Sequence, residues 1–413
     1  MDIPAADFTN NARQVIDLAY QQAVRRQSER VEPGHLLLGI LGVKGNRALQ
    51  TLSALKVDLD QLVGMLESRL PAGTGYPLGV EAAPRWEGEG KDALHYAIKE
   101  ARHLGHHQVD TLHLLLGLLY EGRGVACDAL EHFDVSLYEL RQHVLNNPAL
   151  TRTMRAPRAS RVPLPSLTFL GLLSVFVVSG VLLWLNPAES LIGALMLVFI
   201  VCGWIVSVCV HEFGHALAAF LGGDLSVKDK GYLTLDPIRY TDPLFSIIMP
   251  VIFLLLGGFG LPGGAVYINT SALRSRWWQT IVSAAGPLGT IVFCALIVWP
   301  FFLDWRDWVT ESNQYFWAAL TYLALLQITA VIFNLIPIPP LDGFGIASPW
   351  LPNDLRNQMM MFGNLLFFVL LFVMWNDNPF TQAFWTQVYD IASFLRLPFD
   401  MLLLAGEHLF FLQ

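Results

Sequence analysis

Charged residues are scarce in this chain. Only 15% of its 413 residues are Asp, Glu, Lys or Arg, and 54% are hydrophobic. An average globular protein carries roughly 25% charged residues. This composition excludes a wholly soluble protein, because the excess apolar surface must face something other than water.

The chain also lacks an excess of positive charge. Its formal net charge is −8, so nucleic acid is not an expected partner. Basic residues cluster locally instead, at Arg152, Arg155, Arg158 and Arg161, directly before the first long apolar run. A short basic flank of this kind indicates the cytoplasmic side of a membrane span.

Cysteine is rare, and no pair of the four cysteines has the spacing of metal ligands. Cys202, Cys209 and Cys294 lie inside apolar runs, which favours burial as small hydrophobic side chains. The first residues lack a basic region followed by an apolar core. We therefore expect no cleavable signal peptide and a cytoplasmic N-terminal third.

Residues 1–150 have ordinary soluble composition and contain an internal repeat. The segment His35–Gly39, with the sequence HLLLG, matches His113–Gly117 at an offset of 78 residues, and apolar residues recur at helical spacing within each copy. A Gly- and Pro-rich stretch over Pro71–Gly90 separates the copies. These features predict two small pseudo-symmetric helical bundles, followed by a basic linker over 151–166.

These repeats resemble the double N-terminal domain of Clp-family unfoldases. The resemblance lies in FTNNARQVIDLAYQQA with PGHLLLGIL in the first copy, and in KDALHYAIKEA with DTLHLLLGLL in the second. It implies a module that docks peptides or adaptor proteins.

From residue 167 the chain is dominated by long apolar runs. At about 1.5 Å per residue, the uncharged run over Leu167–Leu185 is long enough to cross a hydrocarbon core of roughly 30 Å. Further runs cover Leu191–Leu221, Pro243–Leu261, Thr280–Leu303, Tyr315–Ile336 and Met359–Trp375. The predicted fold is therefore all-α: a polytopic membrane helix bundle over 167–383, preceded by a soluble duplicated α-helical domain.

Two of the apolar segments are ambiguous. Pro243–Leu261 could cross the bilayer or turn back within it, and Pro250 with Gly257 and Gly258 favours a re-entrant hairpin. The C-terminal segment, 384–413, is interrupted by charged residues. It is expected to form an interfacial or membrane-associated helix, or a paired last span.

The distribution of Lys and Arg among the short loops predicts the topology. The loop Asp224–Asp242 contains three basic residues and belongs inside, whereas Asn186–Ser190 contains none and belongs outside. We therefore expect a multi-pass protein of the inner membrane of a bacterial cell, with its second long span carrying a polar island near the cytoplasmic end.

That polar island has the sequence HEFGH. His211 and His215 are four residues apart, so on a helix they lie on one face and can bind one ion. Zinc suits imidazole nitrogens, and Glu212 is placed to accept a proton from a water at the metal. Ionisable residues are costly inside a membrane span, so a metal site is favoured over a chance occurrence of the pattern.

A third ligand is expected from the segment Asn334–Gly343, with the sequence NLIPIPPLDG. Its prolines interrupt a helix at membrane depth and place Asp342 beside a glycine, as is typical of backbone that lines a cavity. Taken alone, the segment could also be a loop leaving the bilayer, with Asp342 in a turn.

HEFGH and NLIPIPPLDG resemble, in sequence and in order, the two motifs of site-2 proteases. The resemblance implies that His211, His215 and Asp342 bind Zn²⁺, that Glu212 is the general base, and that Asn334 holds the substrate backbone or the oxyanion. A third segment, SAAGPLGT, resembles the family's Ala-Gly-Pro segment, but Thr290 stands where the family usually has Asn. The sequence is compatible both with a polar contact of this segment to substrate and with helix packing through its small residues.

The resulting hypothesis is an intramembrane zinc metalloprotease that cleaves membrane-protein substrates in the lipid bilayer. The main alternative is a non-catalytic membrane scaffold or receptor that displays the Clp-like module, and a metal-ion transporter is a third. Glu212 between the histidines argues against a purely structural site. A transporter would need more intramembrane His or acidic residues than the chain has. No feature of the sequence indicates an oligomeric state.

Overall fold

A computed structural model of the chain describes residues 8–70, 84–145, 164–239, 266–303 and 305–409. Within these ranges the regular elements are helices, and β-pairing is limited to two isolated bridges, which confirms the all-α fold. The chain divides into two compact units. The N-terminal unit comprises Met1–Arg161 with Asn269–Arg274, and the C-terminal unit comprises Val162–Ile268 and Ser275–Gln413.

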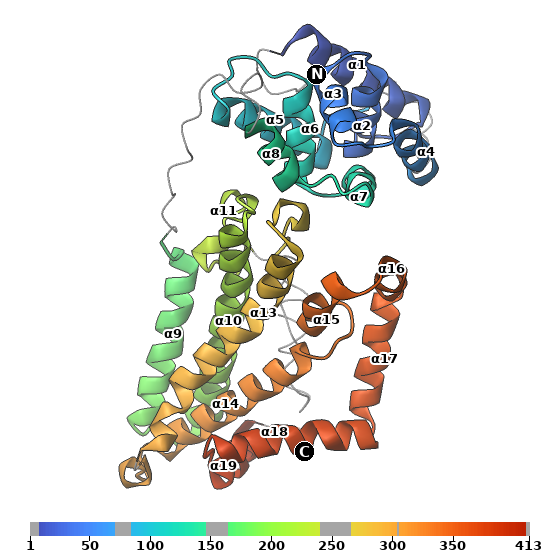
Figure 1. The fold of residues 1–413 in the computed structure, drawn as a ribbon. Coiled ribbons are helices and arrows are strands. Elements are labelled where there is room, and N and C mark those ends of the chain that lie inside the picture. The colour runs from blue at the N-terminus through green and yellow to red at the C-terminus, as the bar shows by residue number, and fades with distance from the viewer. Residues whose placement is uncertain (1–7, 71–83, 146–163, 240–265, 304, 410–413) are drawn as a thin grey trace, which may run out of the picture. The chain divides into compact units, whose positions relative to one another are not determined.

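The N-terminal unit is a duplicated set of four helices. The first copy contains α1 (Asn10–Arg25), α2 (Pro33–Gly42), α3 (Arg47–Ala54) and α4 (Leu59–Arg69). The second contains α5 (Glu89–His103), α6 (Thr111–Glu121), α7 (Val125–His132) and α8 (Leu137–Leu145), coloured from cyan to green in Figure 1. The helices α6, α7 and α8 each begin 78 residues after α2, α3 and α4, so the repeat seen in the sequence is a repeat of structure.

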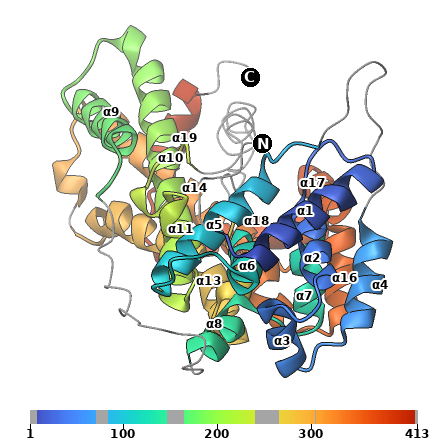
Figure 2. The same cartoon turned by 90° about the horizontal axis from the view of Figure 1, so that it is seen from above.

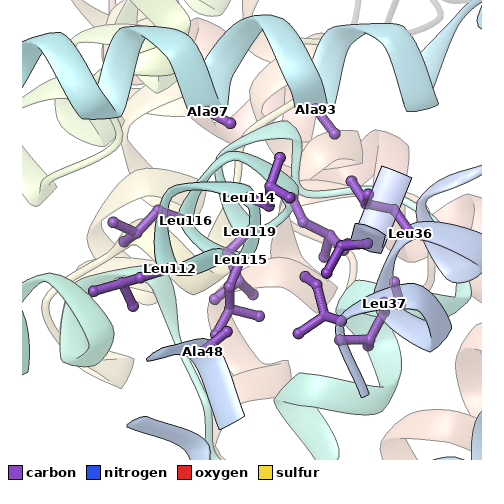
Figure 3. Close-up of a cluster of buried hydrophobic side chains, with 14 of the residues drawn as sticks. Leu36, Leu37, Ala48, Ala93, Ala97, Leu112, Leu114, Leu115, Leu116 and Leu119 are labelled. Carbon is purple, nitrogen blue, oxygen red and sulfur yellow. The ribbon is translucent and has the colours of Figure 1, made fainter. Parts of the chain in front are cut away.

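The two copies share one hydrophobic core, which differs from the two separate bundles that we expected. Buried residues of both copies belong to a single cluster, in which Leu36 and Leu37 of α2 pack with leucines of α6 (Figure 3). The helical pattern of each copy marks its apolar face, but the pattern alone does not say what that face packs against.

The repeated histidine of HLLLG caps the start of its own helix. The backbone N–H of Glu32 donates to Nδ1 of His35 at 3.1 Å, and that of Asp110 donates to Nδ1 of His113 at 2.9 Å. Both histidines are 1% exposed. They satisfy a backbone donor at a helix N-terminus, where such groups have no partner within the helix.

Burial of His35 predicts a pH dependence of the N-terminal unit. Burial, assisted by the charge of Arg26, lowers the pKa of His35 to about 4 from its ordinary value of 6.5. The unfolded chain therefore binds the proton first, and stability is lost as the pH falls from 6.5 to 4. We expect hydrogen exchange of α2 to quicken over this range, and less so in His35→Gln. An equal response in both proteins would contradict the assignment.

The repeated glycine of HLLLG lets two helix backbones approach closely. A Cβ on Gly39 would lie 2.5 Å from the carbonyl oxygen of Val15, and one on Gly117 would lie 2.7 Å from Cα of Ala97. Figure 3 shows Ala93 and Ala97 of α5 above the leucines of α6. Small residues on both helices therefore determine how closely they pack.

Replacing Gly117 by alanine is expected to destabilise the N-terminal unit by about 1–3 kcal/mol, because the added methyl group overpacks the contact between α5 and α6. Gly64→Ala in α4 is the matched control, since a Cβ there meets nothing within 4 Å. That control should gain roughly 0.5–1 kcal/mol of helix stability. Hydrogen exchange of α6 in the full chain measures both effects, and a neutral Gly117→Ala would show that the contact is not tight.

The C-terminal unit contains four helices that are long and apolar enough to cross a membrane. These are α9 (Leu167–Trp184), α10 (Glu189–Gly222), α13 (Arg276–Val298, continued by η4, Trp299–Phe302) and α14 (Gln314–Asn334). Helix α9 packs beside α10 in both views (Figures 1 and 2). The predicted span over Pro243–Leu261, crossing or hairpin, lies outside the described residues, as does most of the linker.

Short elements connect and follow these helices. They are α11 (Ser226–Asp229), η1 (Tyr232–Thr234), η5 (Trp305–Trp308), α15 (Asp342–Ala347) and η6 (Ser348–Trp350), and η3 (Thr270–Ala272) belongs to the N-terminal unit. Tryptophans lie near the ends of two of the long helices: Trp184 ends α9, Trp299 follows the end of α13, and Trp277 lies at the opposite end of α13. Tryptophan at helix ends is typical of the two interfaces of a bilayer.

The apolar run over Met359–Trp375 is not one straight span. It is divided between α16 (Asn353–Met361) and α17 (Gly363–Trp375), which are bent by 63° at Phe362. Helix α16 begins with the polar sequence NDLRNQ, which favours a position at the membrane interface. Helix α17 is apolar and is suited to the hydrocarbon core. The single predicted span is therefore a bent pair of helices.

The C-terminal segment forms two helices instead of one. Helix α18 (Pro379–Phe394) begins before the predicted boundary at 384 and runs across the end of α17, and α19 (Phe399–Leu409) follows Pro398 (Figure 1). Proline cannot donate to a helical hydrogen bond, so it separates the two helices. The interfacial position of this segment stays a prediction.

Candidate metal centre

The two histidines of HEFGH lie towards the C-terminal end of the 34-residue helix α10 and face the same side. Their Nε2 atoms are 3.1 Å apart. His211 is partly buried and His215 is 7% exposed. The spacing of four residues therefore brings both imidazoles to one point, as the sequence predicted.

Asp342 reaches the same point from the segment that follows α14. Its carboxylate oxygens lie 3.1 Å from Nε2 of His211 and 3.2 Å from Nε2 of His215. The chain turns sharply after Asn334 and starts α15 at Asp342. Gly343 permits this turn, because a Cβ there would lie 2.7 Å from the carbonyl oxygen of Ile336 and closer still to that of Leu335.

The three donor groups fit a zinc ion. His211, His215 and Asp342 form the one metal-ligating group found among the described residues, with all three ligand atoms within 4.8 Å of one another. Tetrahedral zinc with bonds of about 2.0–2.1 Å separates its ligand atoms by roughly 3.3 Å, close to the distances found here. Two imidazoles and one carboxylate are a donor set typical of a catalytic site with an open fourth position.

Residues that do not bind the metal hold both imidazoles by contacts to Nδ1, the ring nitrogen that does not face the metal position. Nδ1 of His215 donates to the carbonyl oxygen of Val282 at 2.7 Å, and Nδ1 of His211 is 3.0 Å from Oγ1 of Thr290. These bonds leave each Nε2 directed at the metal position. The role of Thr290, which the sequence left between substrate contact and helix packing, is thus a hydrogen bond to His211.

Close packing of α13 on α10 brings these partners into range. A Cβ on Gly286 would lie 2.6 Å from Nε2 of His211, and a Cβ on Gly214 would lie 2.9 Å from the carbonyl carbon of Ala285. A Cβ on Gly289 would lie 2.8 Å from the carbonyl oxygen of Val210. The small residues of SAAGPLGT therefore both pack the helices and make room for the metal ligands.

Glu212 is buried next to the ligands, with 3% of its surface exposed. Its carboxylate accepts a hydrogen bond from the backbone N–H of Val266, and Oε2 has no hydrogen-bond partner within the described ranges. A buried carboxylate oxygen without a partner is rare unless a function requires it. It is the group expected of a base that binds a proton during the reaction.

Asp342 supplies the negative charge of the donor set. An aspartate binds a metal ion as its carboxylate, and a histidine binds it as the neutral imidazole.

Asn334, the other predicted site residue, is the last residue of α14 and is 6% exposed. In the described part of the chain, no side-chain hydrogen bond links it to HEFGH or Asp342. It lies eight residues before the aspartate in the chain. Its predicted contact with the substrate backbone stays a prediction.

The contact between Thr290 and His211 can be tested by removing the hydroxyl group. Thr290→Val is expected to weaken zinc binding by about 10–100-fold, because loss of an outer partner frees the ligand ring. Thr290→Ser retains the oxygen and should bind zinc nearly as the parent does. Competition with a chelator of known affinity measures both, and equal affinities for the valine and serine variants would contradict the assigned role.

Comparisons with known proteins give two kinds of match. Residues 7–80 and 89–169 match the family described as the Clp repeat (R) N-terminal domain. ClpC/MecB of Bacillus subtilis, named a negative regulator of genetic competence, is 35% identical over 138 residues, which is 33% of this chain and 16% of that protein. The two predicted Clp-like repeats are confirmed.

Other relatives match about half of the chain and bear the name "Putative zinc metalloprotease Rip2". Rip2 of Mycolicibacterium smegmatis is 38% identical over 214 residues, 50% of this chain and 80% of that protein. Rip2 of Mycobacterium tuberculosis is 39% identical over 235 residues, 55% of this chain and 88% of that protein. The chain therefore belongs to the site-2 protease family of zinc metalloproteases and carries two Clp N-terminal repeats in addition.

Proposed function

We propose that this chain is an intramembrane zinc metalloprotease that hydrolyses peptide bonds of membrane-spanning substrates. The observation that carries the proposal is the convergence of His211, His215 and Asp342 within ligand distance, with Glu212 buried beside them. A structural metal site has no need of a buried carboxylate that is free to take up a proton.

The residues divide the reaction between them. Zinc held by the two imidazoles and Asp342 would polarise the scissile carbonyl and lower the pKa of a water to about 7. Glu212 takes a proton from the attacking water and donates it to the nitrogen of the leaving amine. Asn334 holds the backbone of the substrate next to the scissile bond. A helical substrate must first unwind locally, because its carbonyls are otherwise engaged in the helix.

We further propose that the Clp-like unit selects substrates by binding a peptide or an adaptor protein. The support is the match to Clp N-terminal repeats and an intact core shared by both copies. The protein would lie in the inner membrane of a bacterium with this unit in the cytoplasm, and nucleic acid is not among its proposed partners.

The experiment that tests the function compares membranes from cells that carry the parent chain with membranes from cells that carry Glu212→Gln. Fragments of membrane proteins that accumulate only with the parent chain would identify substrates. If neither chain produces such fragments, while the N-terminal unit still captures partner proteins, the scaffold alternative holds instead.

A further inference from the structure

A short segment directly before α13 belongs to the Clp-like unit. Asn269–Arg274, here called the strap, is part of the N-terminal compact unit, whereas Ile268 and Ser275 on either side of it belong to the C-terminal unit. Ser275 is the N-cap residue of α13. The strap therefore leads without a linker into the helix whose Val282 and Thr290 hold the metal-binding imidazoles.

Asn269 makes the central contact of the strap. It is 2% exposed, and its side-chain amide donates to the backbone carbonyl oxygens of Leu119 at 2.6 Å and Tyr120 at 3.3 Å. Both carbonyls lie in the last turn of α6, where backbone oxygens have no partner within the helix. The amide oxygen accepts from the backbone N–H and the hydroxyl group of Ser271, at 3.1 Å and 2.6 Å. Bonds at both ends of the amide fix its orientation.

The first repeat makes the same kind of contact from within its own sequence. Asn46 is 0% exposed, and its side-chain amide donates to the carbonyl oxygens of Ile40 and Val43 at the end of α2, at 2.7 Å and 2.6 Å. The residue 78 positions after Asn46 is Gly124, the N-cap residue of α7, which has no side chain that could donate. The second repeat therefore lacks the asparagine of the first, and the strap supplies Asn269 to the equivalent helix end.

The surface of the second repeat around Asn269 has room for the strap and little else. Gly122 has a φ of +80°, and a Cβ on it would lie 2.7 Å from Nδ2 of Asn269, so a larger residue there would exclude the amide. Within the strap, η3 packs against α6 and α8. Ala272 is 1% exposed and belongs to the core cluster of the N-terminal unit, and Leu273 is 6% exposed. The strap is thus held by both polar and apolar contacts.

We propose that the end of α6 is a docking site for the chain's own strap, and that the docked strap couples the Clp-like unit to α13. The helix-end carbonyls and the core positions of this face are already occupied by Asn269, Ala272 and Leu273. A partner protein can bind this face only by displacing the strap, and displacement would release the start of α13. Docking needs neither zinc nor proteolysis, so it can be tested separately from the proposed protease function.

The first test is limited proteolysis of the zinc-loaded full chain by trypsin, which cleaves after Arg274 only when the buried residues before it have left their site. Asn269→Asp keeps the size of the side chain but cannot donate to the two carbonyl oxygens. We expect it to raise the rate of cleavage after Arg274 roughly tenfold or more, the effect of losing two ordinary hydrogen bonds. Thr270→Ala is the matched control, because Thr270 is exposed, and it should be cleaved at the parent rate. Equal rates for Asn269→Asp and the parent would overturn the docking site.

Hydrogen exchange of the same proteins separates undocking from general unfolding. In Asn269→Asp, exchange should quicken at the end of α6 and at the start of α13, whereas α2 of the first repeat should exchange as in the parent. Equally fast exchange in α2 would make the strap an inseparable part of the core. Unchanged exchange at the start of α13 would remove the coupling.

The second test supplies the strap as a separate molecule. A synthetic peptide with the sequence of residues 267–274, YINTSALR, is added to the full Asn269→Asp chain at about 1 mM, the effective concentration that a short flexible connection provides. It should slow hydrogen exchange at the end of α6, and the same peptide with aspartate in place of its asparagine should not. If neither peptide slows this exchange, or both do so equally, the site does not recognise the asparagine of the strap and the proposal is wrong.

Discussion

Replacing Glu212 by glutamine is expected to lower the rate of peptide hydrolysis by about 10²–10⁴-fold, because the variant cannot accept a proton from the attacking water. The amide keeps the size of the side chain and can still accept the hydrogen bond from Val266. Zinc content and the melting temperature should therefore stay at the values of the parent chain.

The measurement is cleavage of a helical membrane substrate by the purified chain in detergent or nanodiscs, together with elemental analysis of the same samples. Loss of cleavage with full zinc content supports the assigned base. Undiminished cleavage by the glutamine variant would remove Glu212 from the mechanism, and loss of both zinc and cleavage would make the residue structural.

Replacing Gly286 by alanine is expected to weaken zinc binding strongly, although the residue is not a ligand. The added methyl group would lie 2.6 Å from Nε2 of His211 and 2.5 Å from Cε1 of His215. Atoms cannot share this space, so the imidazole rings must rotate or α13 must move away. We expect a fall in zinc affinity of about 10²-fold or more, the upper end of the loss seen for outer partners of a metal site.

Gly171→Ala in α9 is the matched control for this variant. A Cβ at Gly171 meets nothing within 4 Å, so the same chemical change there should leave zinc binding unaltered. Zinc bound per chain, measured after dialysis against a weak chelator, separates the two. A Gly286→Ala protein with full zinc would mean that the histidines and α13 are less closely packed than the structure describes.

The ligands of the metal centre could be predicted from the sequence because each sits in a short, distinctive pattern. The helical spacing of His211 and His215 places both rings on one face, and the prolines before Asp342 predict a broken helix at membrane depth. The structure brings these three side chains together. It also explains why a glycine follows Asp342, because Gly343 lies against the carbonyl oxygens of Leu335 and Ile336 and leaves no room for a side chain.

Contacts between distant parts of the chain could not be predicted in the same way. Ser207 and Gln327, whose side chains are hydrogen-bonded, are 120 residues apart, and neither belongs to a recognisable pattern. Thr290 lies in a segment of small residues, and the sequence does not indicate which side chain its hydroxyl contacts. The packing of α13 on α10 brings that hydroxyl to His211.

Some features of the fold were visible in the sequence and others depended on packing. The offset of 78 residues predicted a duplicated helical domain, but it did not show that the copies share one core. An apolar face on a helix does not specify which other helix will cover it. The bend at Phe362 was likewise hidden, since hydropathy continues across it and only the polar residues of α16 signal a change of direction.

The close contact between α10 and α13 constrains how this sequence can diverge. Gly214 lies against the backbone of Ala285, Gly289 lies against the backbone of Val210, and Gly286 lies against the imidazoles of the metal ligands. A smaller side chain on the opposite helix cannot make room at 214 or 289, because the atoms in the way belong to the main chain. Among homologues that keep this helix spacing, all three positions should therefore stay glycine, and a change at any of them should come with a displacement of one whole helix.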